Sequence, residues 1–77
     1  MLDREQRRDF YRLLETASAR QLQQELADLE YALEIARESS APVPEEIRDL
    51  NWLLRATREE IQARAEVEAI LRRHQSR

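Results

Sequence analysis

The stretch that decides the fold is Ser-Ser-Ala-Pro-Val-Pro at residues 39–44. Each proline lacks a backbone donor and restricts the residue before it, so a helix cannot run through this stretch. On both sides the chain is rich in Ala, Leu, Glu, Arg and Gln, which favour helices, and it contains no glycine. The sequence therefore predicts a loop over 39–44 between two long helices.

A second, weaker break lies at residues 16–18. Ser18 and Gln21 have the spacing of a capping box, in which the serine hydroxyl accepts a hydrogen bond from a free amide of the new helix. Pro44 suits the first position of a helix, where a missing N–H costs nothing. We therefore expect a single all-α domain over 1–77, with helices near 3–15, 19–38 and 45–73.

The two long helices carry matching apolar seams with residues three and four positions apart. The seams consist of Ala19, Leu22, Leu26, Leu29, Leu33 and Ala36, and of Ile47, Leu50, Leu54, Thr57, Ile61 and Ala65. When the chain folds back at the proline loop, Leu33 lies near Leu50 and Leu29 near Leu54. The pattern predicts an antiparallel helical hairpin preceded by a short N-terminal helix.

Each long helix also carries apolar residues on its far side, which a single hairpin leaves without a partner. The residues predicted to form a partner or dimer interface are Tyr31, Ile35, Trp52, Ala56, Ala63, Val67 and Ile70. We expect the N-terminal helix to cover the C-terminal apolar residues Val67, Ile70 and Leu71, and to leave an aromatic patch around Trp52 exposed. A homodimer in the form of a four-helix bundle would bury both far sides, and docking of another protein is the alternative.

Charge is distributed unevenly along the chain, whose net charge is −3. Eight acidic residues and two arginines lie between Glu25 and Asp49, which predicts an acidic loop end. The opposite end is expected to bring both termini and their arginines together. The possible nucleic-acid contacts there are Arg4, Arg8, Arg12, Arg72 and Arg73. The negative total charge argues against a domain that depends on phosphate contacts.

Residues suited to catalysis or metal binding are scarce. The chain has no cysteine, and its one histidine, His74, lies near the C-terminus. The ladder Glu30, Glu34 and Glu38 lacks the histidine partners that carboxylate metal sites in bundles use. We therefore expect no enzymatic activity, no cofactor, no metal and no small-molecule substrate.

These features favour a small non-enzymatic protein that binds a larger protein and blocks or bridges it. In type it resembles the small all-helical accessory proteins of bacteria and phages. The alternatives are a nucleic-acid-binding regulator that uses the Arg-rich end and a structural subunit of a larger assembly. Without cysteine, a long apolar run or the apolar core of a signal peptide, we expect a cytoplasmic protein that does not enter membranes.

Overall fold

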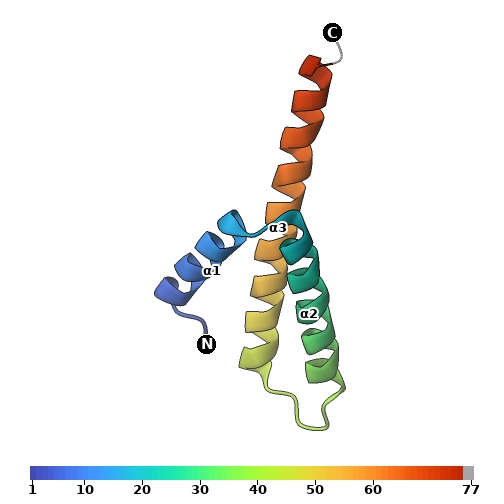
Figure 1. Ribbon diagram of the computed structural model, residues 1–77. Coiled ribbons are helices and arrows are strands. Elements are labelled where there is room, and N and C mark those ends of the chain that lie inside the picture. Colours follow the sequence, from blue (N-terminus) through green and yellow to red (C-terminus); the bar gives the residue numbers. More distant parts are fainter. Residues whose placement is uncertain (76–77) are drawn as a thin grey trace.

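The computed structural model describes residues 1–75, and in that range the chain forms three helices (Figure 1). They are α1 (Arg4–Thr16), α2 (Ala19–Glu38) and α3 (Pro44–Gln75). The prediction of an all-α chain is confirmed, because no strand occurs among these residues. Within the same range, no helix combines the length and the apolar character that crossing a membrane requires.

Side chains cap the starts of α1 and α2. Ser18 Oγ accepts a hydrogen bond from the Gln21 amide at 3.1 Å, and Gln21 Oε1 accepts one from the Ser18 amide at 2.7 Å. This is the predicted capping box. Asp3 and Gln6 form a second capping box at the start of α1, which the sequence analysis missed. The chain changes direction between α1 and α2 at Ala17 and Ser18, which are both in extended conformation. The capping box at Ser18 then provides hydrogen-bond partners at the start of α2.

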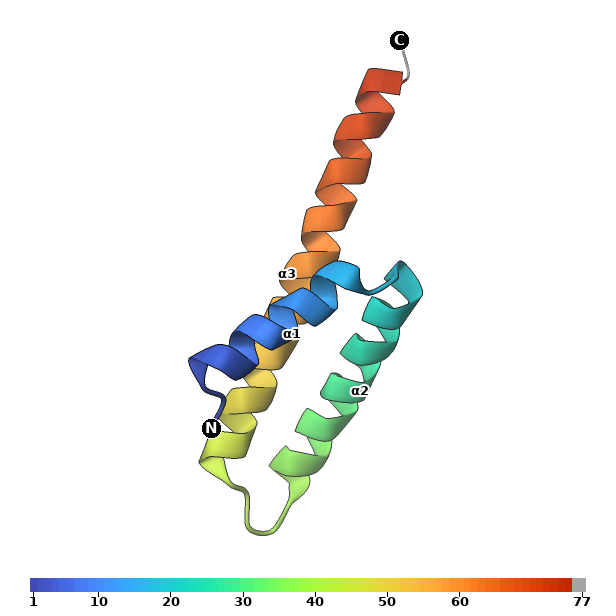
Figure 2. The same cartoon turned by 60° about the vertical axis from the view of Figure 1, so that its left-hand side comes forward.

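The helices α2 and α3 lie side by side and run in opposite directions, as Figure 1 and Figure 2 show. Their contact is built on a buried cluster of leucines with four partly buried neighbours from the two helices. The cluster comprises Leu29, Leu33 and Leu54, with Leu26, Ile47, Leu50 and Leu53 around it. It contains both members of the expected pairs Leu33–Leu50 and Leu29–Leu54. Burial of these side chains is the main source of stability here, at about 1.5–3 kcal/mol for each that is fully buried.

Polar groups at this contact contribute less. Thr57 is fully buried, and its hydroxyl donates to the Leu53 carbonyl at 2.8 Å, so the polar group is satisfied within its own helix. The ion pair between Glu30 and Arg58 joins α2 to α3 at 3.5 Å, but both side chains are more than half exposed. Such a pair contributes about 0–1 kcal/mol. The leucine cluster, and not the ion pair, therefore holds α2 and α3 together.

The short helix α1 lies against the first half of α3, which differs from the expected position. The N-terminal amino group of Met1 is 3.5 Å from Asp49, and the Leu2 amide donates to the same carboxylate at 3.2 Å. At the other end of α1, the Leu14 carbonyl accepts a hydrogen bond from Arg64 at 2.9 Å. The helix therefore spans α3 from Asp49 to Arg64. The expectation that it covers the C-terminal apolar residues of α3 is wrong.

A second buried cluster explains this position. It comprises Leu14, Leu22 and Ala56, one residue from each helix, with Phe10, Ala17, Trp52 and Ile61 partly buried around it. Folded back over the α2–α3 pair, the apolar side of α1 contacts two helices at once. Placed over the C-terminal turns of α3, it would contact only one helix and bury less apolar surface.

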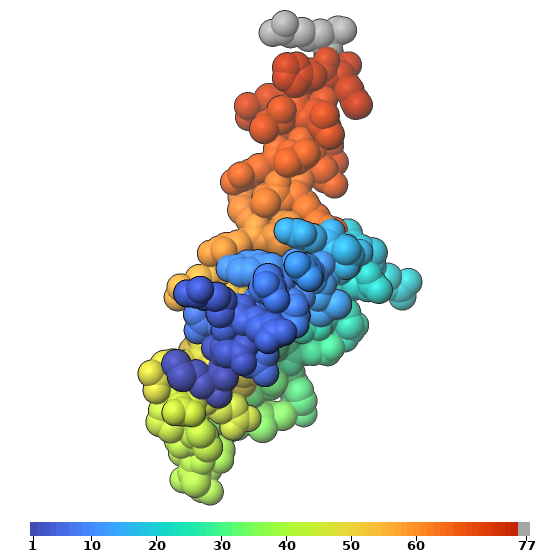
Figure 3. All heavy atoms as spheres, turned by 90° about the vertical axis from the view of Figure 1, so that its left-hand side faces the viewer, coloured from blue at the N-terminus to red at the C-terminus, as the bar shows by residue number. Residues whose placement is uncertain are grey.

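The last turns of α3 extend well beyond the rest of the molecule, as the ribbon in Figure 1 and the space-filling view in Figure 3 show. Every residue from Ala65 to Gln75 is exposed. The molecule measures 57 × 26 × 16 Å along its principal axes, so it is far from spherical. We call residues 62–75 the projecting segment, and the remainder of the described chain the body.

Candidate interaction surface

Trp52 of α3 is covered by α1. The Phe10 ring lies 6.1 Å from the Trp52 ring in a tilted arrangement, and the Tyr11 ring packs edge-on at 5.3 Å. The guanidinium carbon of Arg7 is 5.1 Å from the centroid of the same indole, a distance at which cation–π attraction is effective. Arg7 Nε is buried without a hydrogen-bond acceptor, and the aromatic face is what it lies against. Trp52 therefore packs against residues of α1 in the same chain.

The residues predicted to form one interface are separated into three groups. Trp52 and Ala56 lie under α1, and Ala56 is only 3% exposed. Tyr31 and Ile35 lie on the outer side of α2, with 67% and 51% of their surface exposed. The remaining three, Ala63, Val67 and Ile70, lie on the projecting segment. The expected aromatic patch is therefore split, because α1 covers its tryptophan and leaves its tyrosine on another helix.

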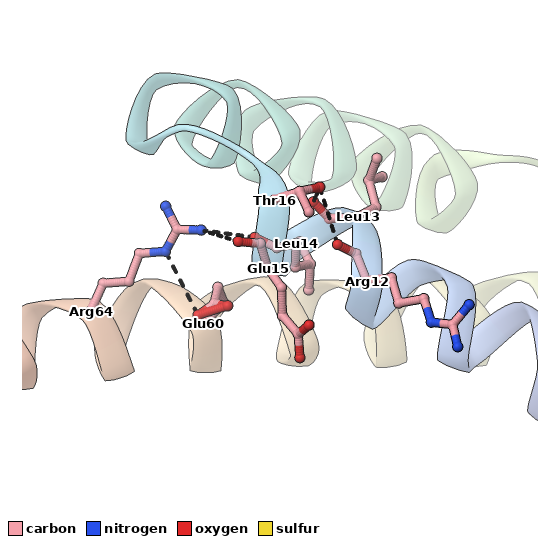
Figure 4. A network of polar contacts seen from close by, with 7 residues as sticks. All are labelled: Arg12, Leu13, Leu14, Glu15, Thr16, Glu60 and Arg64. Carbon is pink, nitrogen blue, oxygen red and sulfur yellow. Dashed lines mark hydrogen bonds and ion pairs between the residues drawn. The ribbon is translucent and has the colours of Figure 1, made fainter.

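Arg64, in the first turn of the projecting segment, attaches α3 to the end of α1 (Figure 4). Its guanidinium donates from Nη2 to the carbonyls of Leu14 and Glu15, at 2.9 and 3.4 Å, and its Nε lies 3.7 Å from Glu60 on the preceding turn. The Leu14 carbonyl also accepts a hydrogen bond from the Ala17 amide at 3.4 Å, so Arg64 adds a second donor there and supplies a donor to the Glu15 carbonyl at the end of α1. After Arg64, no residue of α3 up to Gln75 is buried by another described part of the chain.

The projecting segment carries an apolar face. Val67, Ile70 and Leu71 retain 56%, 52% and 53% of their surface. Ala63, Val67, Ile70 and His74 follow one another at intervals of four, three and four residues, and Leu71 lies next to Ile70, about 100° further round the helix, so all five lie on one side of it. Val67, Ile70 and Leu71 each have more than half of their surface in contact with water, so the projecting segment presents an exposed apolar face.

The arginines predicted to form a basic end are not close together. Helix α1, which lies against the first half of α3, carries the exposed residues Arg4, Arg8 and Arg12. Arg72 and Arg73 lie in the last turns of α3, at the far end of the molecule, and Arg72 forms an ion pair with Glu68 at 4.0 Å. Figure 1 shows the start of α1 well separated from the last turns of α3. The expectation that both termini form one Arg-rich end is wrong, because α1 turns back along α3.

An open cleft of about 650 Å³ lies where the N-terminus meets the first half of α3. Its lining includes Trp52 and charged side chains of both signs, namely Arg7, Arg48, Arg55 and Arg58 with Glu45, Asp49 and Glu59. Asp49 is already engaged by the N-terminus. The mixed charge presents no field of a single sign to an anion or a cation, so we assign no ligand to this cleft.

The carboxylate ladder on α2 is a surface feature. Glu30 pairs with Arg58 of α3, and Glu34 and Glu38 are exposed. Over residues 1–75, no three His, Cys, Asp or Glu side chains are grouped in a way that could hold a metal ion. His74 is exposed in the last turn of α3.

Comparison with known proteins gave no match among protein-family models, curated proteins or solved structures. The function is therefore inferred from the residues and their geometry alone.

Proposed function

We propose that this protein is a non-enzymatic protein–protein interaction module that binds through the apolar face of the projecting segment. The observation that carries the proposal is the exposure of Val67, Ile70 and Leu71 on a helix that no other described part of the chain covers. Single apolar side chains are normal on protein surfaces. Three that share one side of a lone helix have the form in which amphipathic helices enter grooves and coiled coils.

The shape of the molecule favours bridging over simple blocking. The antiparallel pair α2–α3, braced by α1, would act as one body from which the projecting segment extends, and the molecule is 57 Å long. A second exposed apolar pair, Tyr31 and Ile35, lies on the outer side of α2 in the acidic half of the chain. Two separate contact surfaces allow one protein to hold two others, in the manner of a cytoplasmic accessory or regulatory protein.

We also propose a homodimer built as a four-helix bundle, in which the position of α1 restricts the side through which two copies can pack. Since α1 occupies the Trp52 side of α3, two copies could form a side-by-side bundle only through the side of α2 that carries Tyr31 and Ile35. Sensitivity of a dimer to Ile35→Asp would support this arrangement.

Site-specific photo-crosslinking tests the proposed function. The photoreactive residue p-benzoylphenylalanine would replace Val67 in one sample and Ser40, an exposed loop residue, in the control. We expect protein adducts from position 67 and few from position 40 after irradiation in the cells that make the protein. Equal labelling at the two positions, or adducts to nucleic acid only, would contradict the proposal.

Nucleic-acid binding is the alternative, and salt dependence separates it from the proposed function. Contacts from Arg4, Arg8 and Arg12 to phosphates would weaken steeply as salt rises, because counterions compete for them. Burial of an apolar face responds little to the same change. Binding to a mixed-sequence duplex that falls about tenfold or more with rising salt would favour the alternative.

A further inference from the structure

We propose that the apolar face of the projecting segment binds the same segment of a second copy of this chain, with the two helices antiparallel and Val67 packed against Ile70 of the second copy. This inference rests on the proposed function, since it names the partner of the same surface. Three observations support it: the symmetry of the apolar face, the length of free helix and the arrangement of charge.

The apolar face is complementary to itself in an antiparallel arrangement. Ala63, Val67, Ile70 and His74 follow one another at intervals of four, three and four residues, a sequence that is unchanged when read backwards. At 100° per residue these positions occupy a stripe about 60° wide, as at the contact between two coiled helices. A two-fold axis between Val67 and Ile70 places each of these residues opposite the other, and Ala63 opposite His74.

The free length of α3 fits this pairing. The end of α1 is attached to α3 at Arg64, in the first turn of the projecting segment, and every residue from Ala65 to Gln75 is exposed. With the axis between Val67 and Ile70, Gln62 of one copy lies opposite Gln75 of the other, so the two projecting segments overlap over their whole length of about 20 Å.

Charge selects the antiparallel orientation over the parallel one. The first half of the projecting segment contains Glu66 and Glu68 together with Arg64, a net charge of −1, and the second half contains Arg72 and Arg73. Antiparallel packing places the acidic half of each copy beside the basic half of the other, whereas parallel packing places like charges together. Glu66 and Arg73 also occupy the flanking positions of the stripe, where charges determine the choice of partner and orientation in coiled coils.

The contact between the two projecting segments is small, so we expect a weak affinity. Two helices that overlap over about 20 Å bury less than the roughly 800 Å² per partner of standard stable complexes. We therefore expect a reversible dimer with a dissociation constant in the micromolar range, and not a permanent assembly.

Light scattering of the full chain over a hundredfold range of concentration tests the association. We expect the molar mass to rise from monomer to dimer, and Val67→Asp to raise the dissociation constant at least about tenfold, because it places an unpaired charge in the contact. Ala69→Asp is the matched control, since it adds the same charge to the same segment away from the stripe, and it should leave the dimer unchanged. A monomer at every concentration, or a dimer that Val67→Asp does not weaken, would overturn the inference.

Disulfide trapping tests the orientation, and the absence of cysteine from the chain makes every introduced thiol unique. A mixture of the Ala63→Cys and His74→Cys variants should form the mixed disulfide, because the two positions face each other. Each variant alone should form little disulfide, since identical positions lie about 16 Å apart along the antiparallel pair, beyond the span of a disulfide. Rapid disulfide formation by each variant alone would show a parallel pair and overturn the inference.

These results separate the inference from the proposed function. A monomeric protein that photo-crosslinks to a different protein through position 67 would overturn the second copy as partner and leave the interaction module intact. A dimer that is sensitive to Ile35→Asp and not to Val67→Asp would assign self-association to the outer side of α2 instead.

Discussion

The position of α1 can be tested through Phe10, because this side chain contacts both buried clusters and lies 6.1 Å from the Trp52 ring. The change to make is Phe10→Ala, which removes the ring and leaves the helix a residue that favours helix formation. If α1 lies over Trp52, this substitution should detach the helix from the body. If α1 lay elsewhere, the substitution would have little effect on Trp52.

The size of the effect follows from burial. Replacing a fully buried phenylalanine with alanine costs about 3–5 kcal/mol, and Phe10 is partly buried, so we expect a loss of about 2–3 kcal/mol. A domain of this length has a free energy of unfolding of about 4–12 kcal/mol. Each kcal/mol lowers the thermal midpoint by about 4–8 °C, so the midpoint should fall by about 8–24 °C.

Two signals would be recorded at a low protein concentration, where self-association does not contribute. Trp52 is the only tryptophan of the chain, so its fluorescence reports on the cover that α1 provides, while far-ultraviolet circular dichroism follows the helices. We expect a red shift of the emission in Phe10→Ala together with the lower midpoint. Leu13→Ala is the control on the same helix, since Leu13 is 57% exposed and should change both signals little. Unchanged emission and an unchanged midpoint in Phe10→Ala would refute the position of α1 described above.

Three further substitutions test separate parts of the structure. Leu29→Asp places a charge in the leucine cluster and should unfold the chain, as circular dichroism would show; a folded variant would rule out the assigned contact between α2 and α3. Ser18→Ala removes the capping hydroxyl of α2 and should cost about 1 kcal/mol, or about 4–8 °C in the thermal midpoint, and a loss within error would mean that this cap is not needed. Arg64→Ala should remove the donor to the Glu15 carbonyl and leave the Leu14 carbonyl with only its long bond from the Ala17 amide, which should increase amide hydrogen exchange in the last turn of α1 more than in α2, so equal exchange in both helices would argue against this attachment.

The helices and their boundaries were predictable because the signals that set them are local. The proline pair ends one helix and starts another, and Ser18 with Gln21 caps the start of α2, whatever the rest of the chain does. The contact between α2 and α3 was also predictable at the level of residue pairs. The proline loop determines which positions face each other, so the three-and-four spacing of leucines on both sides is enough to align them.

The candidate surface was predicted less completely. Val67 and Ile70 were included as part of an apolar side with no partner in the α2–α3 pair, but the expectation that α1 covers them was wrong, and their role in binding stays a prediction. Trp52 and Ala56 were included for the same property, but α1 covers them. The sequence analysis missed Arg64. The Leu14 carbonyl that it binds lies 50 residues away in the sequence, and because every residue has a backbone carbonyl, no sequence pattern marks this one as an acceptor.

The sequence by itself determined three helices, their ends and the seam between the two long ones, because hydrogen bonding within a helix, capping and the period of apolar residues all operate over a few residues. Only the tertiary structure decided which part of α3 the short helix covers. Either half of α3 offered an apolar side to α1, and the outcome depended on how much surface each placement buries. Over the first half, α1 contacts two helices through Phe10 and Leu14. That difference in burial leaves Trp52 partly buried beneath α1 and leaves the projecting segment uncovered.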